Sequence, residues 1–254
     1  MTMRSLAGAH AIVTGGSQGI GLAIAKHFAS EGASITLVGR DEARLQTALK
    51  SLDLKPGLAP LAEPPKHATF AFNVANLTGW QLMMKQMKAD KRDVDILINA
   101  AGITQNSFLF STGVPDIKEI LNTNLEGTIL GCQQVVKKMM QQKSGCIVNI
   151  SSLLATHAGR GASVYAASKA GIVGLTRALA WEVGRFGIRI NVILPGYIQT
   201  EMTASIAKSA NLESLIPLGR LGSAEEVADA AAFLVKNSYA HNTVLNLDGG
   251  LSAT

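Results

Sequence analysis

The stretch that decides the fold is His10-Ala11-Ile12-Val13-Thr14-Gly15-Gly16-Ser17-Gln18-Gly19-Ile20-Gly21, an apolar run that passes into a glycine-rich turn. Its β-branched start predicts a strand at 10–14, and the apolar spacing after the turn predicts a helix at 19–30. Glycines at 15, 19 and 21 let the turn close and let a pyrophosphate approach the backbone. The free N–H groups and the positive end of the helix favour that anion. The stretch therefore predicts a dinucleotide site, with a glycine-rich turn that binds no ligand as the alternative.

Short β-branched runs continue to alternate with amphipathic stretches along the chain. We expect further strands at 34–38, 69–74, 94–99, 146–150, 189–194 and 244–247, and further helices at 41–52, 76–90, 115–141, 163–185 and 223–236. Strands that alternate with helices form βαβ units with parallel pairing. No shift in composition and no internal repeat divides the chain. The sequence predicts an α/β fold in which residues 1–254 form a single Rossmann-type domain. Its doubly wound parallel sheet has about seven strands, with helices on both faces.

Composition narrows the class of protein. The 254 residues are 47% apolar and 16% charged, which excludes an intrinsically disordered chain. Cys132 and Cys146 are too few for a disulfide framework, so we expect reduced, packed thiols. The net charge is +5, but lysines and arginines are scattered, and we expect no nucleic-acid partner. No apolar run reaches the ~18 residues of a membrane span, so we expect no membrane partner. The cytoplasm and the mitochondrial matrix both stay open as the compartment.

The end of the second predicted strand, Val38-Gly39-Arg40-Asp41, bears on which dinucleotide binds. Arg40 stands where the 2′-phosphate of NADP would lie, and a guanidinium group can bind phosphate through two hydrogen bonds. This residue favours NADP(H) as the cofactor. Asp41 offers two alternatives, a hydrogen bond to the ribose of NAD or a cap for the following helix. Gln18 adds no second cation to the glycine-rich turn.

A second group of polar residues follows the strand at 146–150. Ser152 comes first, and Tyr165 and Lys169 follow on the helix at 163–185. Four residues make about one helical turn, so Tyr165 and Lys169 share a face. A fixed cation lowers the pKa of a neighbouring phenol, which can then exchange a proton with a carbonyl or alcohol oxygen. Ser152 would orient the same oxygen through a hydrogen bond. For the Tyr-Lys pair alone, an ordinary helix face is the alternative interpretation.

Together these motifs resemble the short-chain dehydrogenase/reductase family over nearly the whole chain. The matching pieces are Gly15–Gly21, Asn99-Ala100-Ala101-Gly102, Asn124, Ser152, Tyr165, Lys169 and Pro195-Gly196. The resemblance implies an oxidoreductase in which Tyr165 is the acid/base and Ser152 polarises the substrate carbonyl. It implies that Lys169 binds the nicotinamide ribose and lowers the pKa of Tyr165. It also implies that Asn124 holds a water that links Lys169 to solvent.

The resemblance assigns Tyr165, like Lys169, to the cofactor as well, and it adds further residues. These are Gly15, Ser17, Gln18, Gly19, Ile20 and Gly21 at the turn, Arg40 after the second strand, Asn73 and Val74 at the adenine, Asn99, Ala100 and Gly102 beneath the cofactor, and Pro195, Gly196, Ile198 and Thr200 at the nicotinamide. Two positions depart from the family pattern, since the usual second Asn is Ala100 and the usual Asp after the third strand is Asn73. Because Asn can still accept a hydrogen bond, we expect little loss from the second departure. No metal site is implied.

Several segments look like those of 3-oxoacyl-(acyl-carrier-protein) reductases, notably 196–203, 216–222 and 246–250. This likeness implies the NADPH-dependent reduction of a 3-oxoacyl thioester in fatty acid synthesis. A carbonyl, sugar or hydroxysteroid-type dehydrogenase with the same machinery stays open, as does a non-catalytic cofactor-binding subunit. Residues 197–220 would form a lid over the substrate.

The same likeness implies an acyl carrier protein, or another thioester, as the partner. An acyl carrier protein is acidic, so basic residues are expected near the mouth of the site. The resemblance places them at Lys143 and at Phe186, which has Arg185 beside it; ordinary solvated charges are the alternative. The resemblance also implies a tetramer built on the helices near 115–141 and 163–185. We expect a homotetramer, and a hetero-oligomer stays open.

Overall fold

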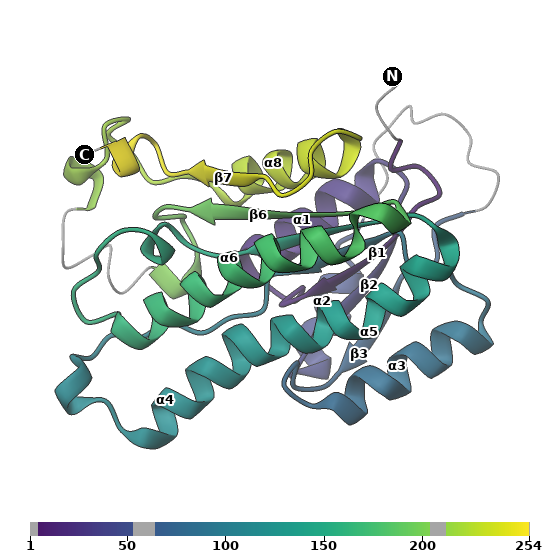
Figure 1. The fold of residues 1–254 in the computed structure, drawn as a ribbon, viewed down its shortest axis with the longest axis horizontal. Helices are drawn as coiled ribbons and strands as arrows, with labels where there is room; N and C mark the ends of the chain where they lie inside the picture. The colour runs from purple at the N-terminus through teal and green to yellow at the C-terminus, as the bar shows by residue number, and fades with distance from the viewer. Residues whose placement is uncertain (1–4, 53–63, 204–211, 254) are drawn as a thin grey trace.

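The computed structural model describes residues 5–52, 64–203 and 212–253, and its centre is a parallel sheet with the strand order β3-β2-β1-β4-β5-β6-β7 (Figure 1). The seven strands are β1 (His10–Thr14), β2 (Ser34–Gly39), β3 (Ala68–Ala71), β4 (Ile96–Asn99), β5 (Gly145–Ile150), β6 (Ile188–Pro195) and β7 (Val244–Leu247). Every neighbouring pair runs parallel. The predicted doubly wound parallel sheet is therefore confirmed.

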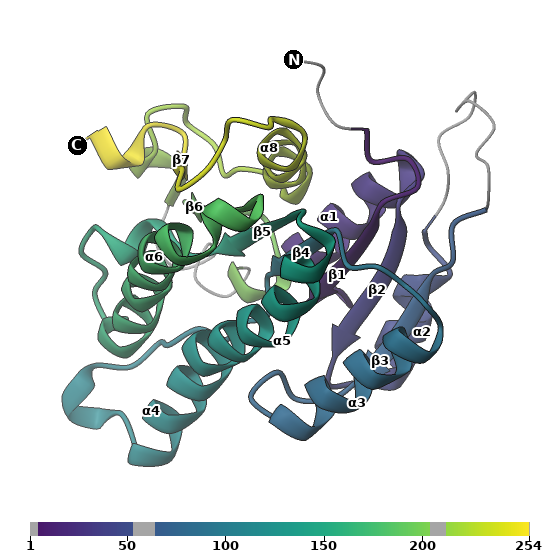
Figure 2. The ribbon, with the colours of Figure 1, turned by 45° about the vertical axis from the view of Figure 1, so that its right-hand side comes forward.

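Helices cover both faces of the sheet (Figure 2). One layer holds α1 (Gly19–Ser30), α2 (Glu42–Leu49) and α8 (Ala224–Lys236), and the other holds α3 (Leu77–Ala89), α5 (Gly127–Gln142) and α6 (Ser163–Val183). Alternate strand residues serve the two layers: Ala11 and Val13 pack in the first core, and Ile12 packs in the second. Strands that are buried on both faces read as nearly continuous apolar runs, which explains the apolar composition.

The structure also bears on the expected state of the cysteines and on the search for a membrane span. Cys132 and Cys146 are both buried, as expected for packed thiols. Across the described residues, no helix combines the length and the apolar character that crossing a membrane requires.

Element ends differ from the predicted ones by up to three residues. β3 ends early because Asn73 turns the chain, with its side chain accepting the Ala75 N–H at 3.0 Å. The helix predicted at 115–141 consists of α4 (Val114–Leu121) and α5, joined by the π-helical turn η2 (Asn122–Glu126). Asn124 is the middle residue of η2, and such turns are frequent at functional sites.

The topology places a ligand crevice beside β1, which lies between β2 and β4. The chain builds β2 and β3 on one side of β1, and β4 to β7 on the other. The loops after β1 and β4 therefore diverge at their carboxyl ends, and this is where doubly wound sheets bind ligands.

The residues expected to receive an acyl carrier protein lie at the amino ends of the strands, and the crevice lies at their carboxyl ends. Lys143 comes just before β5 and Ser152 just after it, and a strand of six residues spans about 20 Å. Phe186, with the Arg185 guanidinium 4.9 Å from its ring centre, precedes β6 and so lies at the same edge as Lys143. We expected Lys143 and Phe186 to flank the mouth of the site. Within one subunit this expectation is wrong, because both residues precede their strands and the site lies where the strands end.

The predicted lid at 197–220 is described at 197–203 and 212–220, while residues 204–211 lie outside the described residues. Ile198 forms an isolated parallel bridge with Gly222, and the Thr203 hydroxyl donates to the Ile198 carbonyl oxygen. These bonds hold the start of the segment beside the crevice.

Candidate active site

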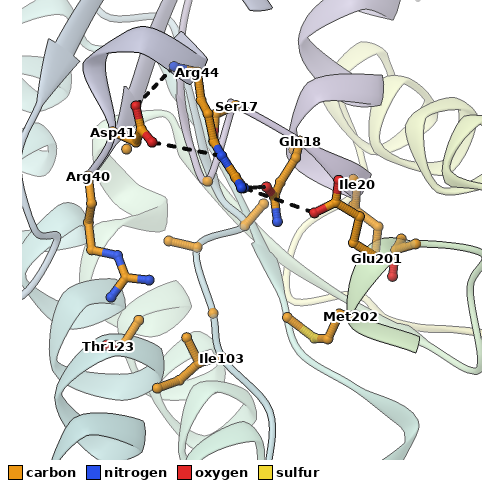
Figure 3. Close-up of a pocket in the computed structure, with 18 residues that line it drawn as sticks. Ser17, Gln18, Ile20, Arg40, Asp41, Arg44, Ile103, Thr123, Glu201 and Met202 are labelled. Carbon is orange, nitrogen blue, oxygen red and sulfur yellow. Dashed lines mark hydrogen bonds and ion pairs between the residues drawn. The ribbon is translucent and has the colours of Figure 1, made fainter. Parts of the chain in front are cut away.

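A cavity of about 470 Å³ opens at the carboxyl ends of β1, β2 and β4 (Figure 3). Ten of the predicted cofactor residues line it, namely Gly15, Ser17, Gln18, Gly19, Ile20, Gly21, Arg40, Ala100, Gly102 and Thr200. Asp41, which the sequence offered as an alternative partner for the ribose of NAD, also lines the cavity, as does Ala101 of the matching piece 99–102. The rest of the lining had no predicted cofactor role and consists of Gly39, Arg44, Ile103, Thr123, Glu201 and Met202. Segments far apart in sequence therefore converge on one cavity.

The glycine-rich turn can be built only without side chains at two positions. A Cβ at Gly15, whose φ is +64°, would lie 2.9 Å from backbone atoms of Ala101, and a Cβ at Gly21 would clash with the carbonyl oxygen of Gly15. Thr14 ties the turn to the loop after β4, because its Oγ1 accepts the N–H groups of Ala100 and Ala101 at 3.1 Å each. The turn is therefore a bare backbone surface along the cavity.

Helix α1 begins at this turn, so its positive end borders the cavity. Its N-cap residue, Gln18, makes no side-chain cap, and the first turn of the helix carries no acidic residue. The first N–H groups of a helix have no partner within it, so an anion placed there gains hydrogen bonds and a favourable dipole interaction. The turn and the helix end together fit the pyrophosphate of a dinucleotide.

Two arginines line this cavity, where the sequence interpretation recognised one. The Arg40 side chain is 61% exposed and pairs with Glu119 at 3.6 Å. Arg44 lies in the first turn of α2, and its Nη1 donates to Gln18 Oε1 at 2.5 Å (Figure 3). Asp41 caps α2 by accepting the Arg44 N–H at 3.0 Å, which was one of its two predicted roles. Gln18, which carries no charge, thus holds a second cation at the turn.

The predicted catalytic side chains meet beyond the carboxyl end of β5. Ser152 follows the strand, and its hydroxyl lies near enough to the phenol of Tyr165 on α6 to affect the pKa of that phenol. Lys169 lies one turn further along α6, where it is buried and donates from Nζ to the Ile150 carbonyl oxygen at 2.9 Å. Its Nζ is 5.7 Å from the centre of the Tyr165 ring. The structure therefore brings Ser152, Tyr165 and Lys169 together.

The electrostatics of Tyr165 differ from the expectation. Burial raises the pKa of the phenol, and the neighbouring Ser152 hydroxyl acts in the opposite direction. Burial also lowers the pKa of Lys169 to about 8. The expected net lowering of the Tyr165 pKa is wrong here, because the loss of water around a buried phenolate is the largest effect on that pKa. The phenol is therefore protonated at neutral pH, as a proton donor must be.

Asn124 joins the catalytic residues to the cavity wall. Its Oδ1 accepts the Ile103 N–H at 2.8 Å, and its Nδ2 donates to the Ile103 carbonyl oxygen and to Ser168 Oγ, both at 3.0 Å. A Cβ on Gly102 would lie 3.3 Å from Asn124 Oδ1 and 3.4 Å from Lys169 Nζ. Asn124 thus fixes the loop after β4 against α6, and its predicted hold on a relay water stays a prediction.

Eight predicted cofactor residues do not line the cavity. Asn99 points into the core, where its Nδ2 donates to Asn149 Oδ1 at 2.9 Å, so its side chain joins β4 to β5. Val74 is buried, and its carbonyl oxygen accepts the Trp80 indole N–H at 2.8 Å. The other six are Asn73, Tyr165, Lys169, Pro195, Gly196 and Ile198. The Asn99 side chain therefore supports the sheet.

Replacing Lys169 by Met is expected to stabilise the fold while removing activity. A pKa lowered to about 8 means that burial disfavours the ammonium form by roughly 3 kcal/mol at neutral pH. The lost hydrogen bond to Ile150 offsets about 1 kcal/mol of that gain. We expect the cofactor-free variant to melt a few degrees above the parent at pH 7.

The stability difference should depend on pH in a defined direction. As the pH rises above about 8, the folded parent loses the lysine proton before the unfolded chain does, so the parent gains stability and the difference shrinks. Circular dichroism melts at pH 7 and near pH 10 measure this, with the exposed Lys85→Met as the control. A Lys169→Met variant that melts below the parent at both pH values would contradict the buried-charge argument.

Known proteins with similar sequences and structures share one family. The short chain dehydrogenase family model matches residues 9–211. Carbonyl reductase family member 4 of Xenopus laevis is 38% identical over 239 residues, which covers 94% of this chain and 96% of that protein. The 3-oxoacyl-(acyl-carrier-protein) reductase FabG of Chlamydia muridarum is 38% identical over 249 residues, covering 95% and 96%. A solved gluconate 5-dehydrogenase of Burkholderia cenocepacia, in complex with NADP and tartrate, gives a TM-score of 0.88 at 29% identity, covering 98% and 96%.

Proposed function

Because this chain belongs to the short-chain dehydrogenase family, we propose that it reduces a 3-oxoacyl thioester to the 3-hydroxyacyl thioester in fatty acid synthesis, with NADPH as the reductant. The observation that carries the reaction type is the placement of Ser152 and Tyr165 next to each other, beside the buried Lys169. The substrate class is supported by the Chlamydia muridarum relative, which is named a 3-oxoacyl reductase.

Each side chain has its own task in this reaction. Tyr165 donates its phenol proton to the carbonyl oxygen of the substrate, which becomes the hydroxyl of the product. Ser152 donates a hydrogen bond to the same oxygen and holds it against the phenol. The ammonium group of Lys169 favours the phenolate that remains after the proton has left. When bound, NADPH supplies the hydride that the carbonyl carbon receives.

The cavity residues fit an NADP-type dinucleotide. The glycine-rich turn and the start of α1 would take the pyrophosphate, and Arg40 and Arg44 would take the 2′-phosphate of the adenosine. Asp41, which would serve the ribose of NAD, is engaged as the cap of α2. These contacts support NADP(H) over NAD as the cofactor.

An acyl carrier protein is the proposed partner, and a homotetramer is the proposed assembly. Large exposed apolar side chains support self-association, since Phe110 and Trp181 are 89% and 87% exposed. Lys143 and Arg185 lie at the far edge of the sheet from Ser152. A neighbouring subunit would therefore have to bring such residues toward the mouth of the site if they steer the carrier protein.

A substrate panel tests the proposed function. NADPH oxidation is followed by absorbance with an acetoacetyl thioester, a keto sugar acid and a simple ketone. We expect kcat/KM for the thioester to exceed the others by roughly tenfold or more. Faster turnover of the keto sugar acid would move the function to a sugar dehydrogenase. Cofactor binding without turnover of any carbonyl would move it to a non-catalytic subunit.

A further inference from the structure

Helix α6, which carries Tyr165, depends on a distant residue for its N-terminal cap. The residue before the helix is Ala162, which makes no side-chain cap. The cap comes instead from Gln105, whose Oε1 accepts the backbone N–H groups of Val164 and Tyr165 at 2.8 and 3.1 Å. Gln105 is buried, with 5% of its surface exposed. A side chain 60 residues away in sequence thus bonds the backbone of the proton donor itself.

The other end of the Gln105 amide is equally engaged. Its Nε2 donates to the Ser107 carbonyl oxygen at 3.0 Å and to Thr112 Oγ1 at 3.1 Å. A glutamine amide offers two N–H donors and one carbonyl acceptor, and all of them have partners here. The amide orientation is unambiguous, because the backbone N–H groups of α6 require an oxygen opposite them. Gln105 therefore joins the loop between β4 and α4 rigidly to the start of α6.

This loop is also held from the side of the cavity. Ile103, two residues before Gln105, lines the cavity and is bonded through both its N–H and its carbonyl oxygen to Asn124. The segment 103–105 is therefore fixed between Asn124 and the backbone of Tyr165. A shift of this segment would move the Tyr165 phenol relative to Ser152, which follows the separate strand β5.

We propose that Gln105 is a positioning residue that sets the Tyr165 phenol against Ser152 and the substrate oxygen. It touches no reacting atom and acts through the backbone of Tyr165. The inference rests on the proposed reaction type, with Tyr165 as proton donor, and it does not depend on which carbonyl compound is the substrate. Misplacement of a catalytic group by about 1 Å can cost on the order of 10²-fold in rate.

The test compares Gln105→Met, which keeps the length of the side chain but loses all four hydrogen bonds, with Gln105→Glu, which keeps the acceptor. A carboxylate at the positive end of α6 is also favoured by the helix dipole. We expect Gln105→Met to lower kcat by roughly 10- to 100-fold with little change in the Kd of NADPH, and Gln105→Glu to restore most of kcat. The assay uses whichever carbonyl compound the parent reduces. The variants can therefore still be compared by kcat if the 3-oxoacyl thioester is not the substrate.

Gln142, at the end of α5 and near the amino end of β5, offers a matched control. Gln142 also bridges backbone groups, accepting the Val94 N–H and donating to the Val94 carbonyl oxygen at 3.1 Å each. Gln142→Met should lower the melting temperature without changing kcat. In alcohol oxidation, Gln105→Met should also move the apparent pKa of the kcat profile upward, because the Tyr165 phenolate would lie farther from the Ser152 hydroxyl, which lowers its pKa.

Three outcomes would overturn the proposal. One is a parental kcat in Gln105→Met. Another is a loss of kcat that Gln142→Met reproduces at the same change in melting temperature. The third is a Gln105→Met profile whose apparent pKa matches the parent while the Kd of NADPH rises in step with the loss of kcat. If Gln105→Met does not fold, a Gln105→Glu variant with parental melting but a kcat as low as that of Tyr165→Phe would refute the role of the acceptor oxygen.

Discussion

Replacing Tyr165 by Phe is expected to lower kcat/KM for carbonyl reduction by about 10³-fold, within the ~10²–10⁴ range that a positioned general acid contributes. The substitution removes one hydroxyl, which lies beside Ser152 and is the proposed source of the proton. Binding of NADPH, followed by fluorescence titration, should stay near that of the parent, because the residues that line the dinucleotide cavity are unchanged.

The matched control for this variant is Tyr239→Phe. It removes the same hydroxyl from a side chain that is 91% exposed and lies after the end of α8, so we expect parental activity. If Tyr165→Phe retained the kcat/KM of the parent, the proton would have to come from another group, and the assigned chemistry would be wrong.

Removing both cavity arginines is expected to abolish the preference for NADPH. A hydrogen bond to a charged group contributes about 1.5–3 kcal/mol, so Arg40→Ala and Arg44→Ala should each raise the Kd of NADPH by roughly 10- to 100-fold. The double variant should lose more NADPH affinity than either single variant. NADH lacks the 2′-phosphate, so its Kd should change little. Titration calorimetry with both cofactors measures the effect.

Arg177→Ala is the control for the loss of positive charge, because this residue is exposed on α6 and does not line the cavity. It should bind both cofactors as the parent does. Arg44 also holds Gln18 at 2.5 Å and lies 3.8 Å from Asp41, so its removal tests whether the turn itself depends on it. Equal losses of NADPH and NADH affinity in the double variant would mean that the arginines shape the glycine-rich turn and do not bind the 2′-phosphate.

Much of the fold could be predicted from the sequence, because local patterns and topology point the same way. The glycine-rich turn lets a strand pass directly into a helix, and the buried strands of the sheet are nearly continuous apolar runs. The site near Ser152 was predictable because the carboxyl ends of parallel strands lie on the same side of the sheet, where ligands bind. The boundaries were less predictable, as at Asn73, where a side-chain hydrogen bond ends the strand.

The remaining features depend on contacts that no short stretch of sequence displays. Arg44 matters at the cavity through Gln18, 26 residues earlier, although its place in the first turn after Asp41 was an available signal. Gln105 reaches Tyr165 across 60 residues, and nothing beside it in sequence marks that role. The raised pKa of Tyr165 comes from burial, which a pairing of Tyr with Lys on a helix face does not reveal.

A crystal structure of the chain with NADP bound would show whether the cavity holds the cofactor as proposed. We expect the 2′-phosphate within hydrogen-bond distance, about 2.7–3.2 Å, of the Arg40 and Arg44 guanidinium groups, and the nicotinamide ring beside the Tyr165 hydroxyl. An adenosine ribose bound to Asp41 with the 2′-phosphate turned away from both arginines, or a nicotinamide ring remote from Tyr165, would contradict it.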